Sequence, residues 1–229
     1  MTLGLMARSP VPGCCKTRLS PPLPPAEAAE LYRAMLEDSF AAYARVELAR
    51  LVVMVAPEHD GPHHIRQLAP PCWEVLAQRG EGLGERLRHA FATLGVDGHA
   101  VALVDSDSPT APIGPIEQGL RALTGTQRAL VGPCEDGGYY LIGLGAVDTR
   151  SLGILAGIPW STSEVMTATR VRASVLGIDL DELPTWYDVD EAADLTRLKA
   201  ELGHRPALAP RTAAWLRSFE ETIRRCELR

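Results

Sequence analysis

The sequence contains no long apolar run, no CxxC cysteine pair and almost no lysine. A membrane-spanning helix needs about 20 consecutive apolar residues, and no stretch of the 229 residues provides them. The first charged residue, Arg8, follows the apolar run at residues 3–7. That order is the reverse of a secretory signal peptide. We therefore expect a cytoplasmic protein with no membrane partner.

The cysteines and the net charge narrow the class of protein further. There are five cysteines, an odd number, and none forms a CxxC pair. This pattern argues against a disulfide framework and against a zinc ribbon. The net charge of −6 argues against a nucleic-acid partner, although it allows a local basic pocket. Small molecules remain as the expected partners, and the composition does not indicate an oligomeric state.

Lysine is the rarest charged residue type. Of the 23 basic residues only Lys16 and Lys199 are lysines, and the others are arginines. A lysine retained in such a chain can mark a position that needs a compact ammonium rather than a planar guanidinium. The alternative is that its retention is chance.

Apolar strands alternate with amphipathic helices along the chain. The expected strands are residues 2–7, 51–56, 74–77, 101–104, 128–131, 139–144 and 178–183. The expected helices are residues 27–43, 59–69, 85–94, 113–123, 164–176, 192–202 and 212–226. This alternation predicts an α/β fold with a mostly parallel sheet covered on both faces. No repeat or low-complexity linker divides the chain, so we expect one domain over residues 1–229.

Two aspartates follow the strand at residues 101–104, in the sequence VDSDSPT. Carboxylates roughly 4 Å apart repel by about 1–4 kcal/mol at surface-like dielectrics. A shared Mg²⁺ or Mn²⁺, completed by phosphate oxygens, would relieve that repulsion. Asp105 and Asp107 are therefore candidate metal ligands. Alternatively, Asp107 or Ser108 caps a following turn that has Pro109 at its first position.

A loop rich in proline and glycine, PVPGCCKTRL, follows the first strand. Gly13 allows close backbone approach, while Lys16 and Arg18 supply positive charge for phosphate oxygens. The loop lacks the GxxxxG spacing of a Walker A motif. The candidate nucleotide-binding residues are Gly13, Lys16, Thr17 and Arg18. A solvated basic loop is the alternative interpretation.

The segment GPCEDGGYYLIGL places acidic and glycine residues between two apolar runs. Asp136-Gly137 is a strong signal for a hairpin turn. A functional interpretation makes Glu135 or Asp136 a carboxylate that faces the substrate, with Gly137 and Gly138 leaving space for it. The two interpretations are compatible with each other.

The segment WYDVDEAADL precedes the helix expected at residues 192–202. One of Asp188 and Asp190 is expected to cap this helix, with Asp194 in its first turn. The other is a candidate second metal ligand. Trp160 and Trp186 are expected to be core or rim aromatics, although each adjoins a motif.

Taken together, these motifs resemble a bacterial family of uncharacterised glycosyltransferase-like proteins with the GT-A, nucleotide-diphospho-sugar transferase fold. Some members of that family are named arsenosugar-biosynthesis glycosyltransferases. The matching segments run in family order from residue 7 to residue 195: ARSPVPGCCKTRLSPPL, QRGEGLGERLRHAF, VDSDSPT, VGPCEDGGYYLIGL, IPWST and LPTWYDVDEAADL. The resemblance implies a Rossmann-like three-layer sandwich. It also implies a nucleotide-binding half over about residues 1–132 and an acceptor-side half over about 133–229.

More distantly, the chain is similar to the guanylyl- and cytidylyltransferases of the same superfamily. That resemblance implies that Gly13, Lys16 and Arg18 contact nucleotide phosphates. It aligns Asp107 with the metal-binding carboxylate after the central strand, and Asp188 or Asp190 with the late one. The family usually has glycine where this chain has Asp105, so the resemblance supports Asp107 more strongly.

Three functions follow from the resemblance. The first is a glycosyltransferase that uses a nucleoside-diphosphate sugar and Mg²⁺ or Mn²⁺. Lys16 would stabilise the departing diphosphate, and Asp136 would deprotonate a small-molecule acceptor. Glu135, Gly137, Gly138 and Trp160 would lie on the acceptor side. The second is a nucleotidyltransferase that releases pyrophosphate, and the third is a nucleotide-binding regulator without catalytic activity.

Overall fold

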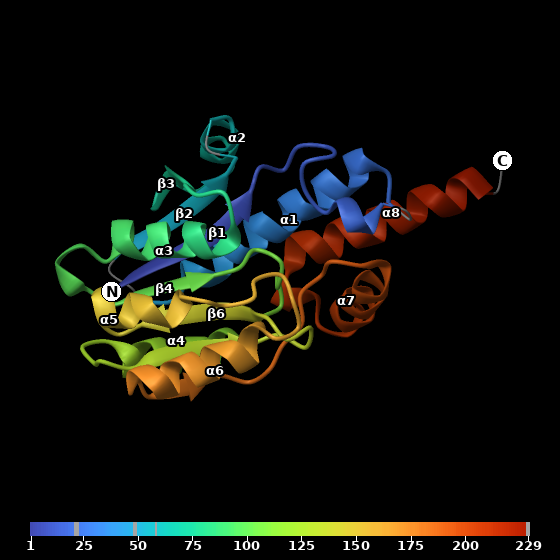
Figure 1. The fold of residues 1–229 in the computed structure, drawn as a ribbon. Coiled ribbons are helices and arrows are strands. Elements are labelled where there is room, and N and C mark those ends of the chain that lie inside the picture. The colour runs from blue at the N-terminus through green and yellow to red at the C-terminus, as the bar shows by residue number, and fades with distance from the viewer. Residues whose placement is uncertain (21–22, 48–49, 58, 228–229) are drawn as a thin grey trace.

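The computed structural model describes residues 1–20, 23–47, 50–57 and 59–227, with side chains up to residue 220. Seven strands form one sheet (Figure 1). They are β1 (Thr2–Arg8), β2 (Arg50–Ala56), β3 (Trp73–Ala77), β4 (Val101–Val104), β5 (Ala129–Pro133), β6 (Tyr139–Leu144) and β7 (Leu180–Glu182). Each lies within two or three residues of a strand expected from the apolar runs, so the strand predictions are confirmed.

The helices also follow the expected pattern. They are α1 (Pro25–Tyr43), α2 (Gly61–Arg66), α3 (Leu83–Leu94), α4 (Ile113–Leu123), α5 (Thr149–Leu152), α6 (Val165–Leu176), α7 (Ala192–His204) and α8 (Pro210–Glu227). Single-turn 3₁₀ helices lie at Thr17–Leu19, Val96–Gly98, Gly153–Leu155 and Pro206–Leu208. The short helix α5 was not expected. None of the helices in the described part of the chain combines the length and the apolar character that crossing a bilayer requires.

The sheet has the order β3-β2-β1-β4-β6-β5-β7. All neighbouring strands are parallel except at β6, which runs antiparallel to β4 and to β5. The prediction of a mostly parallel sheet with a hairpin near residues 133–144 is therefore confirmed. From β1 the chain proceeds outward to β2 and β3, then returns to place β4 on the other side of β1. The carboxyl ends of β1 and β4 thus flank a change in strand order, where ligands bind in open α/β sheets.

Two apolar layers cover the sheet, one on each face. Leu3 and Val53 point into a core that includes Tyr32 and Leu36 of α1. Val52 alternates to the opposite face, where the core includes Phe91 of α3. Period-two alternation within the strands supplies both faces. The result is a three-layer α/β arrangement.

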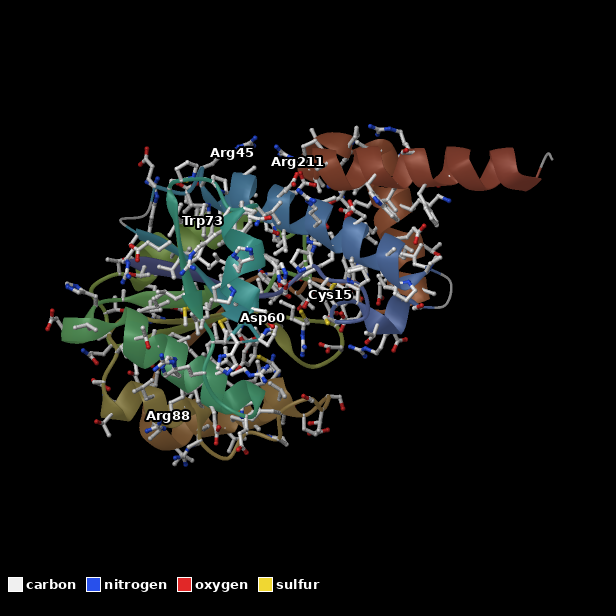
Figure 2. All side chains as sticks on the ribbon, turned by 90° about the horizontal axis from the view of Figure 1, so that it is seen from above. Cys15, Arg45, Asp60, Trp73, Arg88 and Arg211 are labelled. Carbon is white, nitrogen blue, oxygen red and sulfur yellow. The ribbon has the colours of Figure 1, made fainter. Side chains whose placement is uncertain are left out.

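A third cluster joins the C-terminal helices to the body of the protein. Leu31 of α1 packs with Leu198 of α7 and Leu216 of α8. Figure 2 shows Arg211, at the start of α8, next to α1. The buried Asp38 of α1 accepts hydrogen bonds from the backbone N–H groups of Arg211 (3.1 Å) and Thr212 (2.8 Å). A carboxylate on α1 therefore satisfies the first N–H groups of α8.

Candidate functional site

The loops after β1, β4 and β5 and the segment after β7 converge on a cavity of about 1060 Å³. The predicted site residues that line it are Gly13, Lys16, Thr17, Arg18, Asp105, Asp107, Asp136, Gly138, Trp160, Asp188 and Asp190. Glu135 and Gly137 are not part of its lining. These predicted residues come from five segments of the sequence, at residues 13–18, 105–107, 136–138, 160 and 188–190, that contribute to one site.

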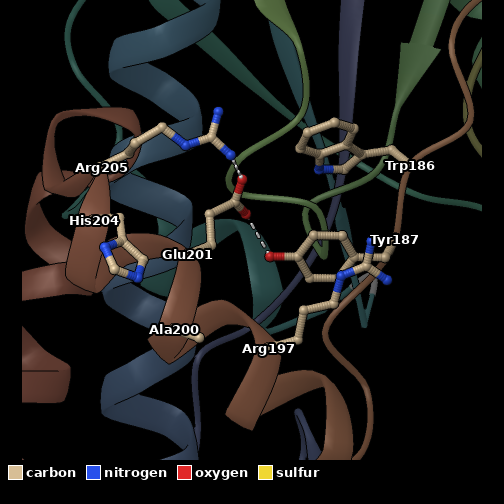
Figure 3. Close-up of a pocket in the computed structure, with 7 residues that line it drawn as sticks. All are labelled: Trp186, Tyr187, Arg197, Ala200, Glu201, His204 and Arg205. Carbon is tan, nitrogen blue, oxygen red and sulfur yellow. Dashed lines mark hydrogen bonds and ion pairs between the residues drawn. The ribbon is translucent and has the colours of Figure 1, made fainter.

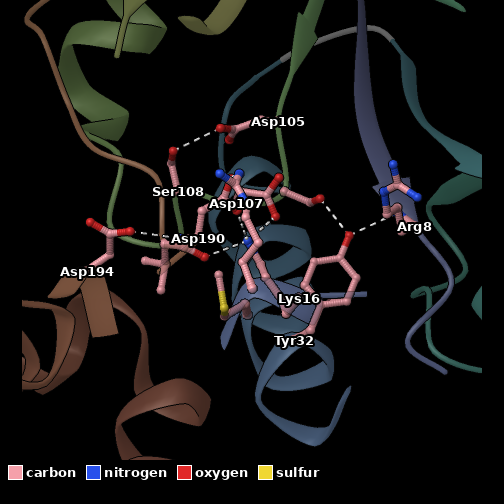
Figure 4. Close-up of polar contacts among 12 residues, drawn as sticks. Arg8, Lys16, Tyr32, Asp105, Asp107, Ser108, Asp190 and Asp194 are labelled. Atoms are coloured by element: carbon pink, nitrogen blue, oxygen red, sulfur yellow. Dashed lines mark hydrogen bonds and ion pairs between the residues drawn. The ribbon is translucent and has the colours of Figure 1, made fainter. Parts of the chain in front are cut away.

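Lys16 is buried at the centre of an ion-paired cluster (Figure 4). Its side chain is only 3% exposed, and its Nζ lies 2.5 Å from Asp107 Oδ1 and 3.1 Å from Asp190 Oδ1. Nζ also donates to the carbonyl oxygen of Val189 at 2.7 Å. A lysine ammonium has three donors, and here each has an acceptor. Lys16 therefore joins the first loop to the strand-end aspartate and to the late segment.

Tyr32 packs its ring against the ammonium of Lys16. Its ring centroid lies 5.8 Å from Lys16 Nζ, within the range of a cation–π contact. Its hydroxyl oxygen accepts from Arg8 N at 2.9 Å and lies 2.7 Å from Ser106 Oγ. The buried ring thus connects the ends of β1 and β4 to the lysine. Burial raises the pKa of this hydroxyl above its ordinary value, so it stays neutral.

The charge of Lys16 is maintained by its partners. Burial alone would lower its pKa, but the carboxylates of Asp107 and Asp190 outweigh burial and raise it. The backbone at Lys16 is left-handed, with φ 48° and ψ 37°. Residues other than glycine adopt this conformation at an energetic cost. The ion pairs and the single turn at Thr17–Leu19 hold the residue in this conformation.

Asp105 and Asp107 have different surroundings. Asp105 Oδ2 accepts from Ser108 Oγ at 3.0 Å, whereas Asp107 pairs with Lys16. Burial first, and then the charge of Asp107, raise the pKa of Asp105 well above its ordinary value. The turn expected with Pro109 at its first position is present, because Ala111 N donates to Ser108 O at 3.1 Å. It does not start a helix, since α4 begins at Ile113 after Pro112.

Asp188 and Asp190 also differ. Asp190 pairs with Lys16 and with Arg18, while Asp188 has no cationic partner among the described residues. Burial, followed by the charges of Asp190 and Asp136, raises the pKa of Asp188 to about 6. The expectation that one of the two aspartates caps α7 is wrong, because Glu191 occupies the cap position.

Asp194, as expected, lies in the first turn of α7. It accepts from the backbone N–H groups of Asp190 (3.1 Å) and Glu191 (2.7 Å). This carboxylate accepts from backbone N–H groups at the start of α7, so the carboxylates of Asp188 and Asp190 are not needed there and face the cavity.

The Asp136-Gly137 turn carries an exposed carboxylate into the cavity. Cys134 N donates to Gly138 O at 3.0 Å, and Gly138 N donates to Asp136 Oδ1 at 2.8 Å. Gly137 has φ 91°, and a Cβ there would lie 2.1 Å from Ser163 O. Both the hairpin and the orientation of Asp136 toward the cavity are therefore present.

Glu135 points away from the cavity, toward α7. Both of its carboxylate oxygens accept from Arg197, at 2.6 and 2.9 Å. Arg197 in turn lies 3.9 Å from the ring centroid of Tyr187. Glu135 thus ties the hairpin turn to α7.

A second, shallower hollow of about 400 Å³ lies at α7 (Figure 3). At its base Glu201 accepts from Tyr187 (2.6 Å), Thr110 (2.9 Å) and Arg205 (2.5 Å). Trp186 stacks on Tyr187 with ring centroids 5.9 Å apart. Because Thr110 follows the DSDSP segment and Tyr187 precedes Asp188, this network ties together the two segments that carry the aspartates.

A divalent cation fits the chemistry of the cavity lining. Among the residues that the structure describes, five carboxylates line the cavity, against four basic side chains: Asp105, Asp107, Asp136, Asp188 and Asp190, with Arg8, Lys16, Arg18 and Arg86. Two of the basic side chains are already paired with Asp107 and Asp190. The raised pKa values of Asp105 and Asp188 reflect burial together with neighbouring negative charge. A bound cation would relieve that charge, and carboxylate oxygens are the ligands that Mg²⁺ and Mn²⁺ prefer.

Among the residues of the site that sequence reasoning missed are Arg8, Arg86 and Tyr32. Arg8 ends β1, and the rule that ligands gather at strand ends would have identified it. Arg86 lies on α3 within the matched segment QRGEGLGERLRHAF. Tyr32 follows an ordinary helical pattern, and only the fold brings its hydroxyl to Ser106.

Comparison with known proteins places the chain in a family. A family model described as an uncharacterized protein conserved in bacteria (DUF2064) matches residues 39–162, more than half of the 229 residues. No curated protein matches the chain. These matches do not test the arsenosugar part of the resemblance.

Solved structures match over most of the chain. A provisionally assigned nucleotide-diphospho-sugar transferase from Desulfovibrio desulfuricans G20 is 32% identical, with a TM-score of 0.86. The match covers 98% of this chain and 97% of that one.

Two more distant structures share the fold only. CMP:2-keto-3-deoxy-manno-octonic acid synthetase in complex with CTP is 14% identical over 89% of this chain and 99% of that one, with a TM-score of 0.56. Rv0371c of Mycobacterium tuberculosis H37Rv in complex with manganese is 16% identical over 86% and 97%, with a TM-score of 0.53. The chain therefore has the α/β Rossmann-like fold of nucleotide-diphospho-sugar transferase structures.

Proposed function

Since this chain belongs to the DUF2064 family of bacterial proteins, we propose that it is a metal-dependent transferase that acts on a nucleotide-activated substrate. More specifically, it is a glycosyltransferase that moves a sugar from a nucleoside-diphosphate sugar to a small acceptor. The similar structure from Desulfovibrio desulfuricans supports the transferase class. The observation that carries the proposal is the group of carboxylates beside an open loop at the strand-order change.

Residues at the carboxyl end of β4 and in the segment before α7 would hold the cation. Asp107 and Asp188 would bind it, with Asp105 next to them. Asp188 is the better late ligand because Asp190 is already paired with Lys16 and Arg18. A bound Mg²⁺ or Mn²⁺ supplies positive charge to the diphosphate as that group departs.

The first loop lies where the phosphates would approach. A Cβ at Gly13 would meet no atom within 4 Å, so the backbone there faces open space. Arg18 is 65% exposed and can turn from Asp190 toward a phosphate. Lys16 holds Asp107 in place and adds its charge to the same region.

Asp136 is the proposed base. Its Oδ1 accepts from Gly138 N, which fixes the carboxylate and leaves Oδ2 for the proton of an acceptor hydroxyl. Gly138 and Trp160 line the cavity beside it. Trp160 is fixed by an edge-on contact with Tyr139, at 6.1 Å between ring centroids. These residues form the acceptor side.

The charges favour a diphosphate donor over a triphosphate. The ammonium of Lys16 has all its donors engaged, and Arg18 pairs with Asp190 and Glu191. The loop therefore offers less unpaired positive charge than its sequence indicates. A nucleoside triphosphate would need more unpaired positive charge than the loop offers.

A nucleotidyltransferase remains the second candidate because of Arg8 and Arg86. Both line the cavity, and neither pairs with a carboxylate among the described residues. Together they could bind a pyrophosphate leaving group.

The two candidates release different products. Protein supplied with Mn²⁺, a panel of nucleoside-diphosphate sugars and a panel of nucleoside triphosphates should release nucleoside diphosphate and no pyrophosphate. Pyrophosphate release with a nucleoside triphosphate would make it a nucleotidyltransferase. Binding of either nucleotide with no product would leave a regulator. Failure of both nucleotide classes to bind in the presence of metal would refute the proposal.

Asp136→Asn tests the proposed base. We expect kcat to fall by about 10²–10⁴, the usual contribution of a general base, with donor affinity unchanged in a calorimetric titration. Glu117→Gln, on the exposed face of α4 beside Arg121, is the control and should retain full turnover. A normal kcat in Asp136→Asn would leave this residue with its turn role alone.

A further inference from the structure

Three side chains in the cavity bring one sulfur and two oxygens together. The Sγ of Cys134 and carboxylate oxygens of Asp136 and Asp188 all lie within 4.8 Å of one another. Cys134 follows β5 directly, Asp136 lies in the hairpin turn, and Asp188 comes from the segment before α7. This group shares Asp188 with the ligands that we propose for the catalytic cation. Its other two members, Cys134 and Asp136, come from the segment between β5 and β6, whereas Asp107 follows β4.

The thiol of Cys134 has no partner in the described part of the chain. The residue is only 7% exposed, and no hydrogen bond to its sulfur is present. The other buried cysteine, Cys15, donates to Val11 O at 3.6 Å. A buried thiol that lies within 4.8 Å of two carboxylate oxygens, but forms no hydrogen bond with them, points to another use for the sulfur. Its surroundings are negatively charged, so that use is to bind a cation.

The backbone holds the three donors in place from two sides. Cys134 forms a bridge with Trp186, Glu135 N donates to Trp186 O at 3.0 Å, and Trp186 N donates to Pro133 O at 2.9 Å. These bonds fix the late segment against the end of β5. The donors are therefore brought together by the fold before any ligand arrives.

We propose that Cys134, Asp136 and Asp188 form a second cation site, which selects a borderline-soft divalent ion of the Zn²⁺ type over Mg²⁺. Thiolate ligands favour Zn²⁺, whereas Mg²⁺ is bound by oxygen alone. Zinc–sulfur and zinc–oxygen bonds of about 2.3 and 2.0–2.2 Å in tetrahedral geometry put ligand atoms about 3.4–3.7 Å apart. The three ligand atoms, which lie within 4.8 Å of one another, therefore need an inward movement of about 1 Å. The site depends on these three side chains and not on the transferase activity.

Occupation of this site would have a consequence for the proposed reaction. A carboxylate oxygen that is coordinated to a metal ion cannot also accept a proton from an acceptor hydroxyl. A zinc-type ion would therefore remove Asp136 from use as a base and take Asp188 from the catalytic cation. Such an ion acts as an inhibitor, while Mg²⁺ or Mn²⁺ at Asp107 supports turnover.

Metal binding to the metal-free full-length protein tests the site without measuring activity. Co²⁺, which takes the ligands of Zn²⁺, gives a near-ultraviolet charge-transfer band when a thiolate binds it. We expect this band in the wild type and in Cys72→Ser, an exposed cysteine that does not line the cavity, and its loss in Cys134→Ser. Loss of an outer-shell partner typically lowers metal affinity by about 10- to 100-fold. The Zn²⁺ affinity of Cys134→Ser, measured by calorimetry, should fall by at least as much, with Mg²⁺ affinity unchanged.

Further variants guard against misfolding and against a competing thiol. Asp188→Asn keeps the thiol, so it should retain the band while its Zn²⁺ affinity falls. Cys14 and Cys15 line the same cavity, and the double variant Cys14→Ser/Cys15→Ser should keep the band. The proposal is overturned if the band persists in Cys134→Ser, disappears in the double variant, or if Asp188→Asn binds Zn²⁺ as tightly as the wild type. Mg²⁺ binding as tight as that of Zn²⁺ to the wild type would also overturn it.

The same preparations separate this inference from the proposed function. Nucleotide binding in the presence of Mg²⁺ is measured beside the Co²⁺ titration. A cobalt band without nucleotide binding would support the second cation site and count against the transferase. Nucleotide binding without a cobalt band would do the reverse.

Discussion

Lys16 shows how far composition can identify a residue of the cavity. The scarcity of lysine singled it out, and the structure places its ammonium among Asp107, Asp190 and Val189 O. The sequence did not indicate those partners, because one of them lies 174 residues away. Residue type and local loop chemistry are readable from the chain, whereas the closing contact depends on the strand order. The prediction that Lys16 contacts phosphate remains a prediction.

Replacing Lys16 by arginine tests whether the compact ammonium matters. A guanidinium has to fit between two carboxylates in a position that is 3% exposed, and its planar fork does not match three acceptors around a point. We expect nucleotide affinity to fall roughly 10- to 150-fold, equivalent to about 1.5–3 kcal/mol for a lost charge-assisted hydrogen bond. Lys199→Arg is the control, because Lys199 is half exposed and pairs with Glu220 on the surface. Unchanged affinity in both variants would show that the retention of Lys16 is chance.

Asp188 gives a prediction about pH. Burial, together with Asp190 and Asp136, raises its pKa from 3.8 to about 6 on folding. Between about pH 4 and pH 6 the folded protein therefore binds more protons than the unfolded chain, so this residue's contribution to the free energy of unfolding falls as pH rises. Asp188→Asn should stabilise the metal-free protein at pH 7 and have little effect at pH 4.

Denaturant titrations at pH 4, 5, 6 and 7 with a chelator present measure this difference. Added Mn²⁺ should remove the advantage of the variant at pH 7, because an ion bound only by the folded wild type adds about 2.7 kcal/mol at 100 times its Kd. A stability difference of the same size at every pH would contradict the raised pKa.

At the scale of the secondary-structure elements, the sequence predicted most of the fold. Apolar runs and helical spacing indicated each strand and all helices except α5. Helix α5 has four residues and depends on a local bond from Ser151 N to Asp148 Oδ1 at 2.7 Å. Four residues are too few for a helical period to be visible. The assignment of caps was less successful. The capping box of α7 is local, formed by Glu191 and Asp194 one residue beyond Asp190, and the turn at Pro109 is not continued into α4.

The hairpin between β5 and β6 can be tested at its glycine. Gly137 is left-handed, and a Cβ would lie 2.1 Å from the backbone oxygen of Ser163. Gly157 is also left-handed, but a Cβ there would meet no atom within 4 Å. Gly157→Ala should cost only the conformational penalty of about 1–2 kcal/mol. Gly137→Ala should cost about 1–3 kcal/mol more for overpacking and should also reduce turnover by moving Asp136.

Chemical denaturation and steady-state kinetics of the two glycine variants provide the measurements. Equal losses of stability would mean that the turn can move away from Ser163 freely. Normal turnover in a folded Gly137→Ala protein would mean that the position of Asp136 is not set by this turn.

At the scale of the whole molecule, the order of the strands creates the site. The strand order reverses at β1, with β2 on one side and β4 on the other, and this brings the first loop to the DSDSP segment. The antiparallel β6 places the Asp136 turn beside them. The alternation of elements predicted the fold class but not this order. Several orders satisfy the same apolar pattern, and only packing selects one.

The attachment of α8 to α1 gives a prediction for the whole molecule. Asp38 is 2% exposed and accepts from two N–H groups of α8, so Asp38→Ala should lower the free energy of unfolding by about 1–3 kcal/mol through unsatisfied buried donors. The neighbouring Glu37 pairs with Arg33 and Arg211 nearer the surface. Glu37→Gln should therefore cost no more than about 1 kcal/mol. Thermal unfolding of both variants measures the two losses of stability. Equal losses would contradict a capping role for Asp38.

The ion pair between Lys16 and Asp190 also has a consequence for protein synthesis. The ribosome adds about 5–20 residues per second, so the 174 residues between the two partners take roughly 10 to 35 s to follow. During that interval the nascent chain can pair β1 with β2 and β4, but its first loop lacks the late acceptor. The acidic cavity therefore gains Asp188 and Asp190 only when residue 190 has left the exit tunnel, and the proposed binding of nucleotide and metal would have to wait until then.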